Sequence, residues 1–188
     1  MAPLLVLVVV TVALRAAGAA GVRRLRSWPV ALRGGLAAMF VVTGMSHFVG
    51  MREDLISMVP PALPEPGLLV TVTGVLELAG AAGLLWRRTV PWAAGGLSAL
   101  LVVMFPANVY AAIAGLTISG SPAMALLPRT LLQVVFLAVT IAVLAAEVRR
   151  RRMSRATDTV GSPASPALTP PVSPNGPARR RASRCSPS

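Results

Sequence analysis

The chain has 188 residues, of which 55% are hydrophobic and 13% are charged, whereas about a quarter of the residues in a soluble domain are charged. Its 18 basic residues are all arginine and outnumber the 6 acidic ones, but they separate apolar blocks and do not line one soluble face, so the charge indicates membrane topology and argues against a nucleic-acid partner. A single cysteine and a single histidine exclude an intrachain disulfide, a CxxC redox pair, a Cys-rich metal site and a pair of histidine haem ligands, and we expect no metal.

Five apolar blocks follow one another along the chain. They are Pro3 to about Val22, Arg33 to Gly50, Gly67 to Trp86, Val90 to about Gly115, and Pro128 to Ala146. A helix needs about 20 residues to cross a hydrocarbon core of about 30 Å, and it satisfies its own backbone hydrogen bonds in lipid. We therefore predict an all-α, multi-pass membrane bundle of five spans. The first block is the weakest candidate for a span.

The positions of the arginines predict the orientation of these spans. Arginines gather in three places: residues 23–33, Arg87 and Arg88, and residues 149–155. The alternate loops, 51–66 and 114–127, carry a small excess of acid or no charge. Because arginine-rich loops stay in the cytoplasm, we predict an N-out/C-in, multi-pass protein of the bacterial plasma membrane.

The first block has an alternative interpretation as a cleaved signal peptide. The segment "AAGAAG" offers small residues near a cleavage point, but the start "MAP" has no basic side chain and the positive charges follow the apolar core. We therefore favour a retained transmembrane helix over residues 1–22. Arg15 would then extend along its own stem toward the cytoplasmic interface.

The end of the chain is predicted to be a disordered, basic cytoplasmic tail, residues 148–188. From Met153 onward it is rich in proline, serine and arginine and has almost no large apolar residues, so it cannot bury a core. The run from Arg149 to Arg152 beside the end of a span would attract anionic lipid, or would serve simply as a stop-transfer anchor.

Two ionisable residues within the apolar blocks are the candidate catalytic residues. Glu77 lies near the middle of the third block, on a helix face that it shares with Thr73 and Gly74, and His47 lies near the outer end of the second block. An ionisable side chain is costly in lipid and tends to face the interior of a bundle. The alternative is that both residues are structural, with a protonated Glu77 that only holds neighbouring helices together.

The stretch "MFPANVYAA" in the fourth block carries further polar groups. Pro106 lacks an N–H group and is expected to bend the helix, while Asn108 and Tyr110 add donors and acceptors. In the predicted topology these residues lie in the outer half of the bundle, on the same side of the membrane as the loop that follows the second block. The resulting candidate binding cavity, with Glu77 deeper, contains His47, Glu53, Asp54, Pro106, Asn108 and Tyr110. A structural alternative for Asn108 is that it caps the bent helix.

Several motifs occur in a recognisable order. They are His47 and Phe48 at the end of one span, a proline-rich loop over residues 60–66, the G-x-x-E helix from Gly74 to Glu77, and the F-P-A-N helix from Phe105 to Asn108. This order resembles the DoxX-like family of small bacterial integral membrane proteins. The resemblance implies a four-helix membrane domain over residues 27–147, to which the first span and the tail are additions.

The resemblance also implies a role in membrane redox chemistry. The family takes its name from a subunit of a thiosulfate:quinone oxidoreductase, so we expect an accessory or quinone-associated subunit of a membrane redox complex, with other oxidoreductase subunits as partners. Glu77 would accept a proton, His47 and Asn108 would donate hydrogen bonds or accept them, and any quinone would be held without covalent attachment. Two alternatives stay open, namely a purely structural membrane subunit and a carrier of a small solute or lipid, which would need to form a homo-oligomer. Whether the chain is itself an enzyme also stays open.

The predicted topology places Cys185, the only thiol of the chain, in the cytoplasm. A membrane-impermeant maleimide should therefore leave the protein unlabelled in intact cells and should label it after the cells are permeabilised. Labelling of intact cells would contradict the N-out/C-in orientation.

Overall fold

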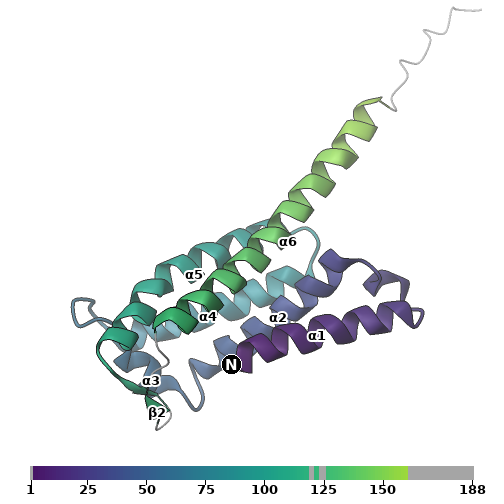
Figure 1. The fold of residues 1–188 in the computed structure, drawn as a ribbon. Helices are drawn as coiled ribbons and strands as arrows, with labels where there is room; N and C mark the ends of the chain where they lie inside the picture. Colours follow the sequence, from purple (N-terminus) through teal and green to yellow (C-terminus); the bar gives the residue numbers. More distant parts are fainter. Residues whose placement is uncertain (1, 119–120, 123–125, 161–188) are drawn as a thin grey trace, which may run out of the picture.

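The computed structural model describes residues 2–118, 121–122 and 126–160, and most of them lie in helices (Figure 1). The helices are α1 (Ala2–Ala19), the short 3-10 helix η1 (Arg23–Leu25), α2 (Trp28–Ser46), α3 (Arg52–Ser57), α4 (Pro66–Leu85), α5 (Val90–Ile113) and α6 (Leu126–Val160). The two-residue strands β1 (Thr117–Ile118) and β2 (Ser121–Pro122) pair in antiparallel fashion. Helices α1, α2, α4, α5 and α6 are long and apolar enough to cross a membrane, which confirms the prediction of five helices of spanning length.

Four of the long helices form a closed ring. Helix α2 packs on α4, α4 on α5 and α5 on α6, and α6 returns to α2, while α1 packs along α2 (Figure 1). The ring surrounds buried side chains from all four of its helices: Leu36, Phe40, Leu84, Leu97 and Val143. Helix α1 is therefore an addition to a four-helix ring.

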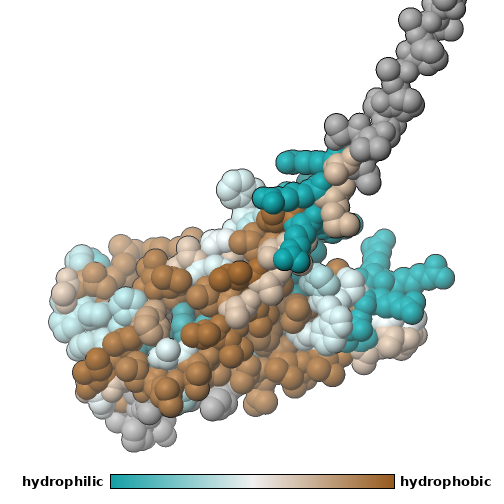
Figure 2. Space-filling view, turned by 45° about the horizontal axis from the view of Figure 1, so that its top comes forward, coloured by the Kyte–Doolittle hydropathy of each residue, from teal (hydrophilic) through white to brown (hydrophobic). Residues whose placement is uncertain are grey.

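The outer surface of the bundle is apolar. Every long helix exposes large hydrophobic side chains, among them Val9, Val42, Leu76, Val103 and Leu131. Figure 2 shows such residues covering the middle of the bundle on the face that it presents. Soluble proteins rarely expose contiguous apolar patches of more than a few hundred Å², so this surface is suited to hydrocarbon.

The arginines of three separate segments gather at one end of the bundle. Arg33 donates through Nε to the carbonyl oxygen of Leu84 at the end of α4, at 3.0 Å. Arg151 donates to the carbonyl oxygens of Arg87 and Arg88, at 2.8 and 2.9 Å. These bonds bring together α2, the α4–α5 connection and α6, and Figure 2 shows hydrophilic side chains concentrated where α6 leaves the bundle. The charge asymmetry used to predict the orientation is therefore present in three dimensions.

Helix α6 is longer than the sequence predicts. It continues to Val160, so residues 148–160, which were expected to begin a disordered tail, are helical. Its 35 residues span about 52 Å at about 1.5 Å per residue, and its C-terminal part projects from the bundle (Figure 1). The reason is local, because arginine is a good helix former and Glu147 pairs with Arg151 one turn later. The rest of the predicted tail, residues 161–188 with Cys185, lies outside the described residues.

Small residues and one arginine hold α1 against α2. A Cβ atom built on Gly35 would lie 2.8 Å from a backbone carbonyl oxygen of α1, and Thr11 of α1 is buried against the same glycine. Arg15 donates to the carbonyl oxygen of Arg26 and lies over the ring of Trp28, with its guanidinium carbon 4.7 Å from the ring centroid. Close backbone approach at small residues is the usual means of helix association in lipid.

The packing of α1 can be tested with a pair of glycine substitutions. We expect Gly35→Ala to lower the free energy of unfolding by about 1–3 kcal/mol, because the added methyl group overlaps the backbone of α1. Gly95→Ala is the matched control, since an added Cβ there has no atom within 4 Å, and it should leave stability unchanged or raise it by up to about 1 kcal/mol. Unfolding would be measured in detergent by heat or denaturant, and equal stability of the two variants would contradict this packing.

Candidate functional site

The two ionisable residues that were predicted within the spans lie in one polar cluster between α2 and α4. Glu77 is 5% exposed and His47 is 3% exposed. Thr43, one turn before His47, donates its hydroxyl group to Oε2 of Glu77 at 2.6 Å. The carbonyl oxygen of Thr43 lies 3.0 Å from Nδ1 of His47. Thr43 therefore connects the two residues, one through its hydroxyl group and the other through its carbonyl group.

The contact with Thr43 determines which nitrogen of a neutral His47 carries the hydrogen. A carbonyl oxygen only accepts, so Nδ1 must be the donor. In a neutral imidazole the other nitrogen, Nε2, is then an acceptor. The buried ring therefore presents a lone pair that can take up a proton, as a general base requires.

The hydroxyl group of Thr43 suits both protonation states of Glu77. Toward a carboxylate it donates its hydrogen to Oε2. Toward a protonated carboxyl group it would accept from Oε2 and turn its own hydrogen to the carbonyl oxygen of Phe40, 3.4 Å away. Because both arrangements keep Glu77 hydrogen-bonded, the cluster can hold or release a proton without a change in the backbone.

Two glycines bring α2 and α4 close enough for these bonds. A Cβ atom on Gly74 of α4 would lie 2.6 Å from Cβ of His47, and one on Gly44 of α2 would lie 2.9 Å from Cγ of Leu78. Larger residues at either position would separate the helices. The two glycines therefore allow the helices to approach closely enough for the hydrogen bond between Thr43 and Glu77.

Arg52 closes the cluster on the side of α3. Its guanidinium group donates to the carbonyl oxygens of His47 and Gly67, at 3.2 and 3.3 Å, and to Oγ1 of Thr71 at 3.1 Å. The carbonyl group of His47 lies at the end of α2, where a helix leaves such groups without an intrahelical partner. Arg52 thus joins α2, α3 and α4. In the sequence, Arg52 is only one charge of the loop 51–66, and its place at the start of a short amphipathic segment is the one signal of this role.

The polar residues of α5 belong to a different contact. Asn108 accepts a hydrogen bond through Oδ1 from Arg129 of α6 at 3.2 Å. Helix α5 continues through Pro106 to Ile113. Tyr110, one helical turn after Pro106, is partly buried. Arg129 was not predicted as a site residue, although it is a single arginine at the start of the last apolar block.

The two acidic residues expected in the cavity lie in the first turn of α3. Glu53 is exposed and Asp54 is partly buried. The structure therefore brings His47 and Glu77 together and pairs Asn108 with α6. The grouping of all the predicted residues in one outer cavity stays a prediction.

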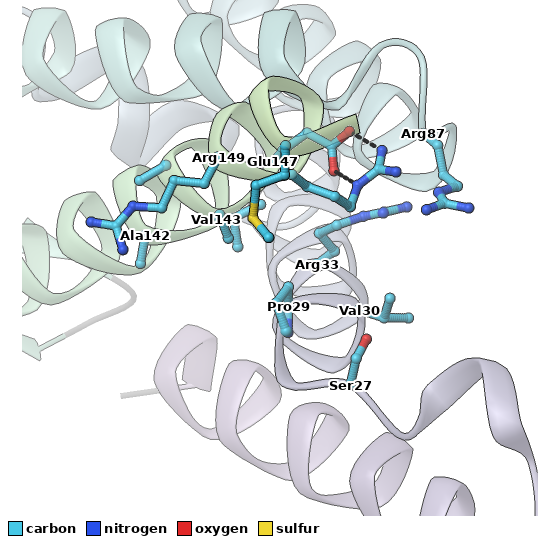
Figure 3. A pocket seen from close by; sticks show the side chains of 13 residues that line it. Ser27, Pro29, Val30, Arg33, Arg87, Ala142, Val143, Glu147 and Arg149 are labelled. Atoms are coloured by element: carbon cyan, nitrogen blue, oxygen red, sulfur yellow. Dashed lines mark hydrogen bonds and ion pairs between the residues drawn. The ribbon is translucent and has the colours of Figure 1, made fainter. Parts of the chain in front are cut away.

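A second charged cluster lies at the opposite end of the bundle. Glu147 is 6% exposed, and it accepts hydrogen bonds from Nε of Arg150 at 3.0 Å and from Nε of Arg151 at 3.1 Å. The cluster borders a cavity of about 660 Å³ (Figure 3). Glu147 was not predicted as a site residue, because it follows the last apolar block, although an acid followed by arginines three and four residues later is typical of ion pairs within a helix.

The described residues include one apolar groove that could hold a cofactor chain. A cavity of about 630 Å³ lies between α4 and α5, where Gly80, Gly83, Gly96 and Leu100 are among the lining residues, and Glu77 and His47 are not. In the described part of the chain, no three His, Cys, Asp or Glu side chains are grouped so that they could hold a metal ion. The groove could therefore take a hydrocarbon chain, but it brings no headgroup to the Glu77 cluster.

Comparison with known proteins identifies one family. The sequence model of the family described as Domain of unknown function (DUF8561) matches residues 36–149, which is more than half of the chain. The chain belongs to this family. The DUF8561 region contains the Glu77 cluster and most of the four-helix ring, whereas α1 and the end of α6 lie outside it. No curated protein and no solved structure matches the chain.

The bond between Thr43 and Glu77 can be tested with two substitutions of similar size. We expect Thr43→Val to lower the free energy of unfolding by about 1–3 kcal/mol, because it removes the hydroxyl partner of a buried carboxyl group. Thr43→Ser keeps the hydroxyl group and should lower the free energy of unfolding by clearly less than Thr43→Val does. The free energies would be measured by unfolding in detergent, and a valine variant as stable as the serine variant would contradict the role of this bond.

Proposed function

We propose that this DUF8561 protein is an integral membrane protein in which the Glu77 cluster handles protons for a membrane redox complex, with the chain as an accessory subunit. The observation that carries the proposal is the link from Glu77 through Thr43 to His47, with both ionisable side chains almost completely buried. A charged side chain at the centre of a span costs about 2.5–3.5 kcal/mol on insertion scales and tends to mark a functional site. The order of DoxX-like motifs supports the same class of role.

The arginine-rich end of the bundle would face the cytoplasm. Positive residues in short loops favour that side, and Arg33, Arg87 and Arg151 meet at this end. The chain would then be N-out/C-in, and α3 with His47 would lie near the outer surface. Glu77 would lie deeper in the span, so the cluster would extend inward from the outer side.

Each residue of the cluster has a distinct part in the proposed proton transfer. His47 would take up a proton at Nε2 and Glu77 would hold a proton deeper in the bundle, as two separate acceptors. The hydroxyl group of Thr43 would turn between Oε2 of Glu77 and the carbonyl oxygen of Phe40 as Glu77 loses or gains its proton. Arg52 is a positioning residue, since it fixes the end of α2 over α4. The electrons would pass through the redox cofactor of a partner subunit.

The quinone suggested by the resemblance is a poorer match to the described residues. The apolar groove between α4 and α5 would suit an isoprenoid chain, but Glu77 and His47 do not line it. We therefore assign the proton-handling role to this chain and derive no step through a quinone bound to it.

The proposal predicts that Glu77→Gln separates function from folding. Glutamine has nearly the same shape and can accept the hydrogen bond from Thr43, but it cannot release a proton. The variant should fold and co-purify with its partner after mild detergent extraction. It should also lower the partner's proton-coupled redox activity at least tenfold in a complemented deletion strain.

Two controls separate this function from a structural one. Gly95→Ala, in α5 with open space around it, should leave activity unchanged. His47→Gln should also lower activity, because it removes the second titratable group. If Glu77→Gln restored full activity, or if activity fell only in step with thermal stability across the polar variants, the proton-handling role would be wrong and a structural subunit would be the better explanation.

A further inference from the structure

The cavity beside Glu147 differs in character from one end to the other. It lies where α2 approaches α6, and its volume is about 660 Å³. Its apolar wall on α6 includes Ala142, Val143 and Ala146. Along α6 this wall comes before Arg149 and Arg150, which also line the cavity, by about one to two turns of about 5.4 Å each. The α6 side of the cavity is therefore apolar toward the middle of the bundle and basic at its end.

The charges around the cavity are unbalanced. Arg33, Arg87, Arg149 and Arg150 line it together with a single acid, Glu147. Glu147 forms its salt bridges with Arg150 and Arg151. Within the described ranges, no salt bridge neutralises the other three lining arginines. An anion would therefore find an excess of positive charge here.

Two of these arginines are directed at a common point. Figure 3 shows the guanidinium groups of Arg33 and Arg87 extending toward one another beside the Glu147 pair, and Arg33 is within Coulombic range of Arg87, Arg150 and Glu147. Arg33 is held in place by bonds to the carbonyl oxygens of Leu84 and Leu85, at 3.0 and 3.3 Å. A guanidinium group has five N–H donors, so a positioned Arg33 keeps donors for a ligand. Two like charges that face each other are stabilised by an anion between them.

We infer that this cavity binds an anionic phospholipid, with the phosphate group between Arg33 and Arg87 and an acyl chain along Ala142 and Val143. Arginine pairs well with phosphate oxygens, and basic pockets between membrane helices on the cytoplasmic side bind anionic headgroups. The volume falls in the range of about 300–1,000 Å³ that is usual for ligand sites. The inference depends on the membrane placement proposed above but not on the role of Glu77, which lies farther along the bundle.

The lipid source is distinguished from a free phosphate by the shape of the cavity. A soluble anion would need only the basic end, and the apolar wall would stay without a ligand. A phospholipid uses both parts at once, and it is always present at the boundary where a spanning helix leaves the hydrocarbon. We therefore commit to the lipid and make free phosphate one arm of the test.

The test uses the full chain purified in detergent, with native mass spectrometry and thermal unfolding as readouts. Phosphatidylglycerol should remain bound and should raise the unfolding midpoint, whereas phosphatidylcholine with the same acyl chains should do neither. The double variant Arg33→Gln with Arg87→Gln should bind phosphatidylglycerol at least tenfold more weakly. The matched control is Arg23→Gln with Arg24→Gln, which removes two exposed charges outside this cavity and should change binding less than twofold.

A second variant guards against misfolding of the first. Ala142→Phe places a ring in the apolar part of the cavity and leaves every arginine in place, so it should also weaken lipid binding at least tenfold. Equal binding of the two lipids, or equal losses in the control and the double variant, would overturn the inference. So would inorganic phosphate that stabilised the protein as well as the lipid does. If the protein dissolved without detergent, the membrane placement itself would fail, whereas an inactive Glu77→Gln variant says nothing about this cavity.

Discussion

The close packing of α2 against α4 is the interaction on which the other features of the molecule depend. Between helices in lipid there is little hydrophobic gain, so van der Waals contact and hydrogen bonds must hold the bundle together. Gly44 and Gly74 provide the contact, and the bond from Thr43 to Glu77 provides a polar link. At the far end of the same helix pair, Arg33 of α2 donates to carbonyl oxygens that end α4. One interface thus carries a polar link at the Glu77 cluster and another at the arginine-rich end of the bundle.

The two ends of that interface are chemically different, and the difference follows from helix direction. Helix α4 ends where α2 begins, so the positive side chain of Arg33 meets the negative end of the α4 dipole, a favourable arrangement. At the other end α2 terminates beside the first turn of α4, and Arg52 satisfies a terminal carbonyl group of α2 there. The arginines that set the predicted topology therefore also complete helix ends, and at the basic end they border a cavity. The arginines can therefore set the topology, cap helix ends and line a cavity at the same time.

The sequence predicts the spans well because lipid imposes a length and a composition on them, and all five apolar blocks correspond to long helices. It also placed Glu77 and His47 on inward faces, since ionisable groups avoid hydrocarbon. It could not name their partners, because helical periodicity orders residues on a face but does not say which helix lies opposite. For this reason the bond from Thr43 to Glu77 and the contact between Asn108 and Arg129 were not predicted. The extension of α6 was missed because a proline- and serine-rich tail concealed the helical tendency of the arginine run before it.

An acid at position 77 is more than a structural link requires. Polar bonds between membrane helices contribute only about 0.6–2 kcal/mol, and a neutral serine, asparagine or glutamine could provide such a bond. A carboxyl group in the same place must either remain protonated or bear the cost of charge in lipid. Its partner, Thr43, can donate its hydroxyl hydrogen to Oε2 of an ionised Glu77 or to the carbonyl oxygen of Phe40 when Glu77 is protonated, so it accommodates both states. The ring of His47, with Nδ1 against the carbonyl oxygen of the same threonine, adds a second buried ionisable group. The proposed proton exchange thus rests on two buried ionisable side chains and on one hydroxyl group that suits both protonation states of Glu77.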